Sequence, residues 1–168
     1  LKGAMSQAIL ISDNDVINSL YELNLRAYVA TNVTIKKSMD GAIKLIEQSP
    51  NIDVIICFRE LNKQDNSFKT IREFLVEKGL TIPIIVLGGT GTPLGNAIVI
   101  QNKYDLKKLL QSLAKILEIS SKDMAGKEVP KYFPIPIKLF GQIKKSHCDI
   151  YFKNQTSDLE YEYFKIIE

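Results

Sequence analysis

The sequence lacks tryptophan and has only two cysteines among its 168 residues, Cys57 and Cys148. Two cysteines without CxxC spacing exclude a disulfide framework and a cysteine-based metal or redox site, so we expect two packed thiols. No apolar run approaches the ~20 residues that cross a bilayer, and the amino terminus has no secretory pattern. These absences predict a cytoplasmic protein with no membrane partner.

The sequence lacks a cluster of charged residues of one sign. The net charge is only +3, and the lysines are dispersed along the chain. A nucleic-acid-binding protein concentrates basic residues on one face or helix, so nucleic acid is not expected as a partner. Glycine and proline are also few, whereas apolar residues make up 45% of the chain. This composition is typical of one globular domain with a full core, followed by a shorter appendage.

Short apolar runs alternate with segments of helical periodicity along the first two thirds of the chain. This order predicts an α/β fold in which helices cover both faces of a parallel, doubly wound five-stranded sheet. The expected strands are 8–11, 27–31, 54–57, 82–87 and 97–100. The first helix should bury Val16, Ile17, Leu20 and Leu23, Ser38 should cap the second, Gly79 should end the third, and the last should span roughly 105–117.

The connection between the fourth and fifth strands is rich in glycine, since it reads GGTGTPLGN over Gly88–Asn96. Such a segment is a poor helix former, and a parallel crossover normally needs about a dozen residues with a helix. We therefore expect a shortened or missing helix there. The loop is either a structural turn or a phosphate or nucleotide cradle, although it lacks the ending of a P-loop. The cradle residues would be Gly88, Gly89, Thr90, Gly91 and Thr92.

The residue pattern changes near residue 119, from helical periodicity to a linker-like stretch followed by strand-like alternation. We expect a first domain at 6–118 that contains these strands and helices, a linker at 119–133 and a β-rich extension at 134–168 that is cut from a longer chain. In the extension, aromatic and apolar residues alternate with polar ones, and one face would carry Ile150, Phe152, Tyr161 and Tyr163. A single hairpin cannot bury such a face. It is therefore either packed on the first domain or used as an interface.

The stretch AILISDND, followed by the third strand, the Pro83-led fourth strand and the helix YDLKKLLQSL, resembles a bacterial response-regulator receiver domain over roughly residues 8–117. The resemblance implies a flavodoxin-like, CheY-like fold. Receivers hold Mg²⁺ with carboxylates after the first strand. Asp13 matches one of these carboxylates, whereas Asn14 replaces the second. Asp13 or Asn14 can cap the first helix, and Asp13 is therefore expected to act as a helix cap and not as a metal ligand.

The remaining receiver positions also depart from the family pattern. The aspartate that accepts the phosphoryl group corresponds to Phe58, the hydroxyl residue after the fourth strand to Gly88, and the lysine after the fifth strand to Asn102. Lys103, the next residue, either reaches into the vacated corner or stays in solvent. Because phosphoryl transfer needs a nucleophile, a metal and a cation together, the resemblance implies a degenerate pocket.

These departures predict a non-enzymatic, phosphorylation-independent regulatory module with no metal and no cofactor. Its expected role is self-association as a homodimer, or docking to another protein in bacterial signal transduction. The alternative is a small-ligand or nucleotide sensor that uses the loop at 88–96. An enzyme is disfavoured because no pair of convergent titratable groups is left at the carboxyl edge of the sheet.

The end of the sequence carries a second resemblance. YFPIPIKLFGQIKKSHCDIYFKN and YEYFKIIE are similar to the strand-rich segment that precedes the catalytic domain in some cyclic-di-GMP signalling proteins of the HD-GYP phosphodiesterase type. The similarity contains no catalytic motif. It implies an amino-terminal regulatory part whose output domain lies in a longer protein.

Overall fold

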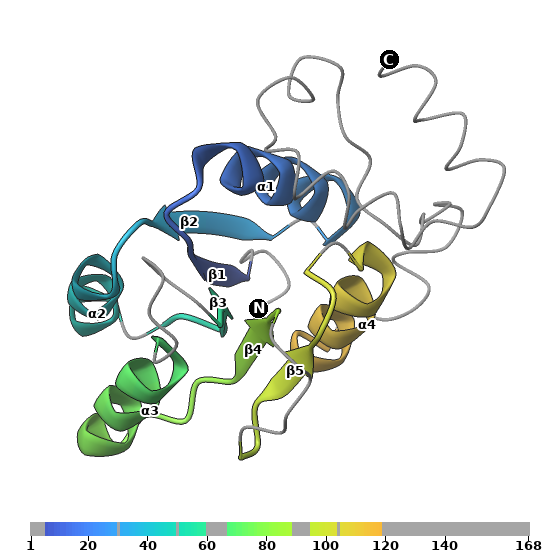
Figure 1. Cartoon of the computed structure of the whole chain (residues 1–168). Coiled ribbons are helices and arrows are strands. Elements are labelled where there is room, and N and C mark those ends of the chain that lie inside the picture. The colour runs from blue at the N-terminus through green and yellow to red at the C-terminus, as the bar shows by residue number, and fades with distance from the viewer. Residues whose placement is uncertain are drawn as a thin grey trace, which may run out of the picture.

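The computed structural model describes residues 6–29, 31–49, 51–59, 67–88, 95–103 and 105–118. They form one five-stranded parallel sheet with the strand order β2-β1-β3-β4-β5 (Figure 1). The strands are β1 (Gln7–Ile11), β2 (Asn32–Lys36), β3 (Val54–Phe58), β4 (Ile84–Leu87) and β5 (Ile98–Ile100). The helices are α1 (Asp15–Val29), α2 (Met39–Gln48), α3 (Ser67–Lys78) and α4 (Leu106–Ile116). The prediction of a doubly wound α/β fold is confirmed.

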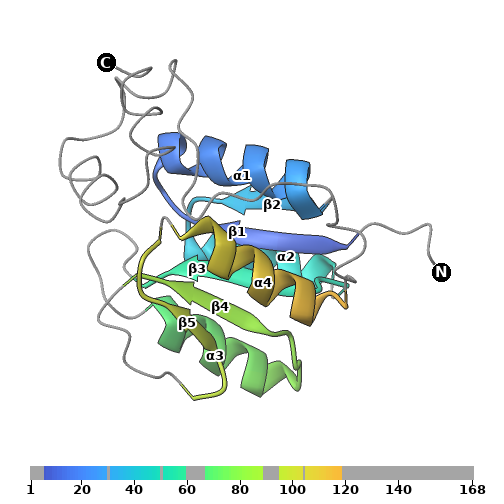
Figure 2. The ribbon, with the colours of Figure 1, turned by 90° about the vertical axis from the view of Figure 1, so that its right-hand side faces the viewer.

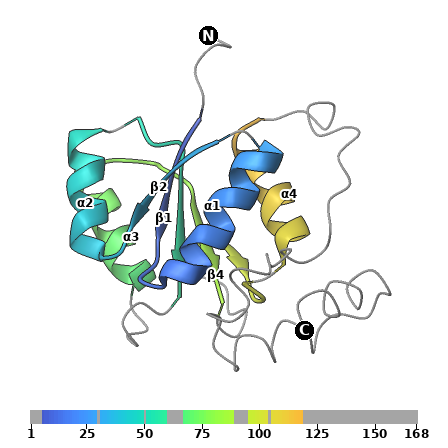
Figure 3. The ribbon, with the colours of Figure 1, turned by 90° about the horizontal axis from the view of Figure 1, so that it is seen from above.

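The helices cover the sheet in two pairs. α1 and α4 lie on one face and α2 and α3 on the other, as the view from above shows (Figure 3). Alternate residues of each strand feed the two cores, because successive side chains of a strand point to opposite faces. Ile56 and Phe58 therefore pack towards α1 and α4, whereas Ile55 and Cys57 pack towards α2 and α3. All five residues of β3 are buried, as expected for a central parallel strand.

The predicted second strand, 27–31, is wrong. α1 continues through Val29, and β2 begins at Asn32. The helix extends because Tyr21, Leu25 and Val29 recur every four residues and pack into the core shared with α4. β2 alternates instead, with Val33 and Ile35 packed against that same core.

The predicted buried side of the first helix is partly wrong. Leu20 is buried, but Leu23 is 52% exposed, on the outer side of α1. The buried positions of this helix include Tyr21 and the polar residues Asn18 and Asn24. Asn24 satisfies its amide group by donating to the Leu20 carbonyl, 2.8 Å away. A polar side chain can therefore take a core-facing position on α1.

The predicted helix ends are confirmed elsewhere. Ser38 is the N-cap of α2, and its hydroxyl accepts a hydrogen bond from the Gly41 amide. Gly79 follows α3 with a φ of 67°, the left-handed conformation that ends many helices. Asp105 caps α4, and its carboxylate accepts from the Lys108 amide at 3.0 Å.

Several predictions fall on residues outside the described ranges. They include part of the crossover, 89–94, and the whole of 119–168, with the proposed linker and the face formed by Ile150, Phe152, Tyr161 and Tyr163. The described ends of the crossover, Gly88 and 95–97, are not helical. The domain limits and the missing crossover helix remain predictions. None of the helices in the described ranges is long and apolar enough to span a bilayer.

Candidate functional site

The candidate site lies where the strands end, at the carboxyl edge of the sheet. Phe58 pairs with Leu87, and Leu87 pairs with Ile100, so the ends of β3, β4 and β5 are level. The Arg59 amide donates to the Leu87 carbonyl at 2.9 Å, and the Gly88 amide donates to the Ile100 carbonyl at 2.8 Å. This register brings Phe58 and Gly88 together with the segment that follows β5.

Phe58 fills the position at the end of β3 with a buried aromatic ring. The residue is only 9% exposed, and its ring stacks on Tyr21 of α1 with centroids 5.5 Å apart and an interplanar angle of 9°. Nζ of Lys103 lies 6.0 Å from the centroid of the Phe58 ring. Of the two alternatives for Lys103, the structure therefore shows the one in which the ammonium group reaches the corner, where the ring attracts it through a cation–π interaction.

Tyr21 is a site residue that the sequence analysis missed. It is fully buried, and its hydroxyl donates a hydrogen bond to the backbone carbonyl of Lys103. One side chain of α1 thus contacts both the end of β3 and the segment after β5. The four-residue spacing from Tyr21 to Leu25 and Val29 was the available signal for its inward orientation.

A polar network fixes the start of α1 against the end of β1. Ser12 and Asn18 are each 3% exposed. The Asn18 amide group donates to the Ser12 carbonyl at 3.0 Å, and the Ser12 hydroxyl accepts from the Asn14 backbone amide at 3.3 Å. The Asn14 backbone carbonyl accepts from the Asn18 backbone amide at 2.9 Å. Asn14 is therefore the residue that immediately precedes α1. Asp13 is exposed one residue earlier, so of the two predicted caps, Asp13 and Asn14, the structure favours Asn14.

Asn102 and Lys103, which follow β5, are both half-buried. The Asn102 carbonyl accepts from the Asp105 amide at 3.0 Å, so this segment turns directly into the cap of α4. At the position of the phosphoryl acceptor the chain has the aromatic ring of Phe58. At the position of the hydroxyl residue it has Gly88, which has no side chain. Among the described residues, no three His, Cys, Asp or Glu side chains gather where a metal ion could bind.

The described ends of the glycine-rich loop have structural roles. Gly88 adopts a φ of 93°, and its amide is already bonded to β5. At the other edge of the sheet, Asn96 accepts a hydrogen bond of 2.7 Å from Arg72 of α3, whose guanidinium lies 5.9 Å from the Phe68 ring centroid. Gly89, Thr90, Gly91 and Thr92 lie outside the described residues, so the ligand loop remains a prediction.

Cys57 is the neighbour of Phe58 in β3, but it points to the opposite core. Burial in apolar surroundings raises the pKa of its thiol to about 12, because the thiolate loses its hydration there. A thiol with this pKa is neutral at physiological pH and is a poor nucleophile. The expectation of a packed thiol is confirmed for Cys57, whereas Cys148 lies outside the described residues.

No protein-family model and no curated protein matches this sequence. Solved structures do match its fold. The Vibrio cholerae chemotaxis protein CheY4 is 17% identical with a TM-score of 0.57, over 67% of this chain and 99% of that protein. A putative response regulator from Chloroflexus aurantiacus is 21% identical with a TM-score of 0.56, over 68% of this chain and 99% of its own.

The receiver domain of the response regulator TorR, from the TMAO respiratory system, is a third similar structure. It is 14% identical with a TM-score of 0.57, and the match covers 67% of this chain and 97% of that domain. The matches cover nearly the whole of these three chains, and the sheet order β2-β1-β3-β4-β5 is that of the flavodoxin-like fold. The first two thirds of this chain therefore have the fold of CheY-like response-regulator receiver domains.

Proposed function

We propose that this chain is a receiver-like regulatory module that acts through protein contacts and accepts no phosphoryl group at the end of β3. The observation that carries the proposal is the aromatic stack. The phosphoryl-acceptor position holds Phe58, whose ring is stacked on Tyr21 and approached by the Lys103 ammonium. A phenyl ring has no nucleophilic atom, so an acyl phosphate cannot form there.

The residues at this edge do not fit the Mg²⁺ ion that receivers use. Mg²⁺ requires several oxygen ligands in near-octahedral geometry. Asp13 supplies one exposed carboxylate, but Asn14 replaces its partner and Phe58 supplies no oxygen. The ammonium of Lys103 lies over the Phe58 ring, and a cation in this corner further disfavours a divalent ion. No step of the proposed function passes through a metal.

The proposed output is assembly: two copies pair, or one copy docks on a partner, in a cytoplasmic signalling protein. A module without phosphoryl chemistry still has the helix faces and loops through which a regulatory domain contacts other proteins. The alternation of apolar and polar residues within 134–168, from which the sequence predicts strands, and the resemblance to HD-GYP-type proteins support a place upstream of a cyclic-di-GMP output domain. The loop at 88–96 gives the alternative of a small-ligand sensor.

Intact-mass spectrometry after incubation with acetyl phosphate and Mg²⁺ tests the chemical part of the proposal. We expect the wild-type chain to gain no hydroxylamine-sensitive phosphoryl group. Phe58→Asp is the matched variant, because it restores the acceptor while Asn14, Gly88 and Asn102 remain. A receiver with an intact aspartate serves as the positive control. Hydroxylamine-sensitive labelling of the wild-type chain contradicts the proposal.

Sedimentation from low to high micromolar concentration tests the assembly part. The molar mass should be the same with and without Mg²⁺ and beryllofluoride, which mimics a bound phosphoryl group. A dimer under both conditions supports constitutive pairing. A strict monomer contradicts self-association and favours docking on another protein, and a change of mass caused by beryllofluoride contradicts the closed pocket around Phe58.

A further inference from the structure

One side chain of α1 joins two segments that lie far apart in the sequence. Tyr21 is fully buried, and its ring stacks on Phe58 at the end of β3. Its hydroxyl donates to the backbone carbonyl of Lys103, which lies 82 positions later and follows β5. Tyr21 thus contacts the closed corner at Phe58 and the segment before α4 at the same time.

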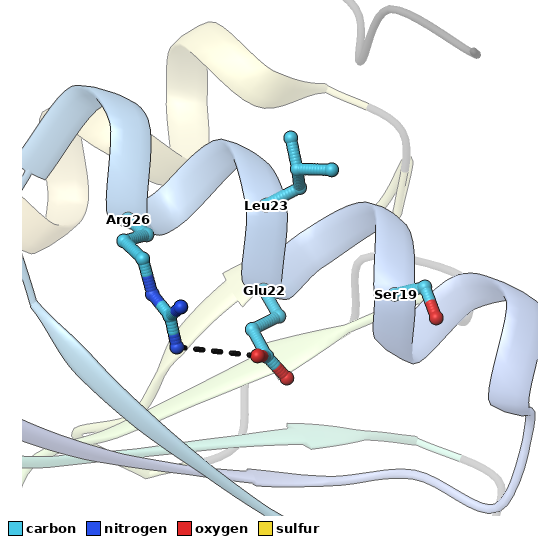
Figure 4. A pocket seen from close by; sticks show the side chains of 4 residues that line it. All are labelled: Ser19, Glu22, Leu23 and Arg26. Carbon is cyan, nitrogen blue, oxygen red and sulfur yellow. Dashed lines mark hydrogen bonds and ion pairs between the residues drawn. The ribbon is translucent and has the colours of Figure 1, made fainter.

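Contacts on two sides of α1 fix the rotation that directs Tyr21 inward. On the inner side, the Asn18 side chain, 3% exposed, donates to the Ser12 carbonyl at the end of β1, 3.0 Å away. On the outer side, Glu22 and Arg26 form an ion pair of 3.2 Å in contact with solvent (Figure 4). Turning Tyr21 away from the corner would break the contact with β1 and bury these charges, which is costly. The ring and hydroxyl of Tyr21 are therefore held in place by the helix that carries them.

The Lys103 carbonyl belongs to the turn that leads into α4. In this turn the Asn102 carbonyl accepts from the Asp105 amide at 3.0 Å. The Asp105 carboxylate then caps α4 by accepting from the Lys108 amide at 3.0 Å. α4 lies beside α1 on the same face of the sheet, as Figures 2 and 3 show. The hydrogen bond from Tyr21 thus ties α1 to the turn from which α4 starts.

We propose that Tyr21 is a latch that couples the closed corner at Phe58 to the start of α4. When the latch is engaged, the segment after β5 and the first turn of α4 keep one position without a bound phosphoryl group. When it is released, the hydroxyl leaves the Lys103 carbonyl and the turn at 102–105 opens. The inference rests on the proposed function, because it explains how a module without phosphoryl chemistry presents a fixed α4 to a partner.

Two contacts on Lys103 oppose the release. The hydrogen bond to its carbonyl comes from a buried hydroxyl, and a hydrogen bond in such surroundings is stronger than in water. The ammonium of the same residue lies 6.0 Å from the centroid of the Phe58 ring, which attracts it. The backbone and the side chain of Lys103 are therefore both held by the stacked pair of Tyr21 and Phe58. The stack and the turn should open together.

Hydrogen exchange of the full chain, resolved at single amides by NMR, tests the latch. Tyr21→Phe keeps the ring and its stack but removes the hydroxyl. We expect the amides of Asp105, Lys108 and Leu109 to exchange about three- to tenfold faster, the factor that follows from losing one hydrogen bond. Tyr28→Phe is the matched control, because it removes the same group from a half-buried position on the same helix. It should leave these three amides unchanged.

A second variant tests whether the stack and the hydrogen bond act as one unit. Phe58→Leu removes the ring on which Tyr21 stacks and leaves the hydroxyl in place. The same three amides should exchange faster, and adding Tyr21→Phe should then accelerate them less than it does in the wild type. Amides within α2, which packs on the other face of the sheet, report global unfolding and serve as the internal reference.

Three results overturn the proposal. The first is equal exchange of the three α4 amides in the wild type and in Tyr21→Phe. The second is equal acceleration in Tyr21→Phe and Tyr28→Phe, or an equal acceleration of the α2 amides, because the whole domain has then loosened. The third is an undiminished effect of Tyr21→Phe in the Phe58→Leu background. Hydroxylamine-sensitive labelling of the wild-type chain contradicts the proposed function instead, so the two failures are seen in different experiments.

Discussion

Replacing Phe58 by alanine probes the aromatic stack most directly. Removing a buried phenylalanine from a core costs about 3–5 kcal/mol. Phe58 is 9% exposed and one side of its ring faces the Lys103 ammonium, so we expect a loss of about 3–4 kcal/mol, in the lower part of that range. This loss includes the stacking on Tyr21, which contributes about 0.5–1.5 kcal/mol.

Urea unfolding followed by far-ultraviolet circular dichroism measures this loss. With a slope of about 2 kcal/mol per molar urea, the midpoint of Phe58→Ala should fall by about 1.5–2 M. Phe74→Ala is the control, because Phe74 is only half-buried, on α3 against the other core, and its loss should be about half as large. Equal losses for the two variants would refute the view that the Phe58 ring closes the site.

A double-mutant cycle separates the cation from the stack. Phe58→Leu keeps an apolar side chain but removes the ring, and Lys103→Met keeps the stem but removes the charge. The coupling free energy between the two changes should be about 0.5–1 kcal/mol, the range of a partly exposed cation–π interaction. A coupling of zero would refute any role of the Lys103 ammonium in filling the corner.

Three smaller changes test other features. Ser38→Ala should lower the free energy of unfolding by about 1 kcal/mol, because the α2 cap is lost, and urea titration measures it. Gly95→Ala should cost more than Gly79→Ala, since both adopt positive φ but only at Gly95 would a Cβ lie 2.9 Å from Arg72 Nη1; the difference should vanish in an Arg72→Ala background. Between the ordinary thiol pKa of 9.0 and the folded value of about 12, the folded state holds the Cys57 proton and the unfolded state releases it. Stability should therefore fall as pH rises through this window, by up to about 1.4 kcal/mol per pH unit, and Cys57→Ala should remove that part of the slope in urea midpoints measured against pH.

The sequence predicts the central sheet well because its signals are strong. Val54–Cys57 is a continuous apolar run, which only a strand buried on both faces accommodates at that length. α4 is equally clear, because its leucines recur at helical spacing and all four of those within the helix are buried. In both cases local preference and tertiary packing favour the same structure.

The second strand was misplaced because the two kinds of signal conflict there. Tyr28 and Val29 are residue types enriched in strands, but both pack against the core from the last turn of α1. β2 lies at the edge of the sheet and carries Asn32, Thr34 and Lys36, so it lacks the apolar run that marked the other strands. In β2, Val33 and Ile35 alternate with these polar residues, and this weaker signal is the one that marks the strand correctly.

The chemistry missing from the candidate site could be read from the sequence, but its replacement could not. That Phe58 stands at the acceptor position follows from the resemblance to receiver domains, in which the acceptor closes the third strand. The stacking of the Phe58 ring on Tyr21 depends on which side of α1 faces the core. The sequence pattern placed Leu23 on that side, and the exposure of Leu23 shows that the predicted side was wrong. The hydrogen bond from Tyr21 to the Lys103 carbonyl joins residues far apart in the chain, and no local pattern predicts it.

The shortness of β5 constrains how this module can meet other proteins. β5 is an edge strand of three residues, and β2, at the other edge, has five and ends in lysine. Short edges and edge lysines discourage a foreign strand from extending a sheet. Backbone pairing is thus a poor route to assembly for this fold, and recognition falls to side chains. Partner choice can then change by surface substitution while the hydrogen-bonded framework stays the same.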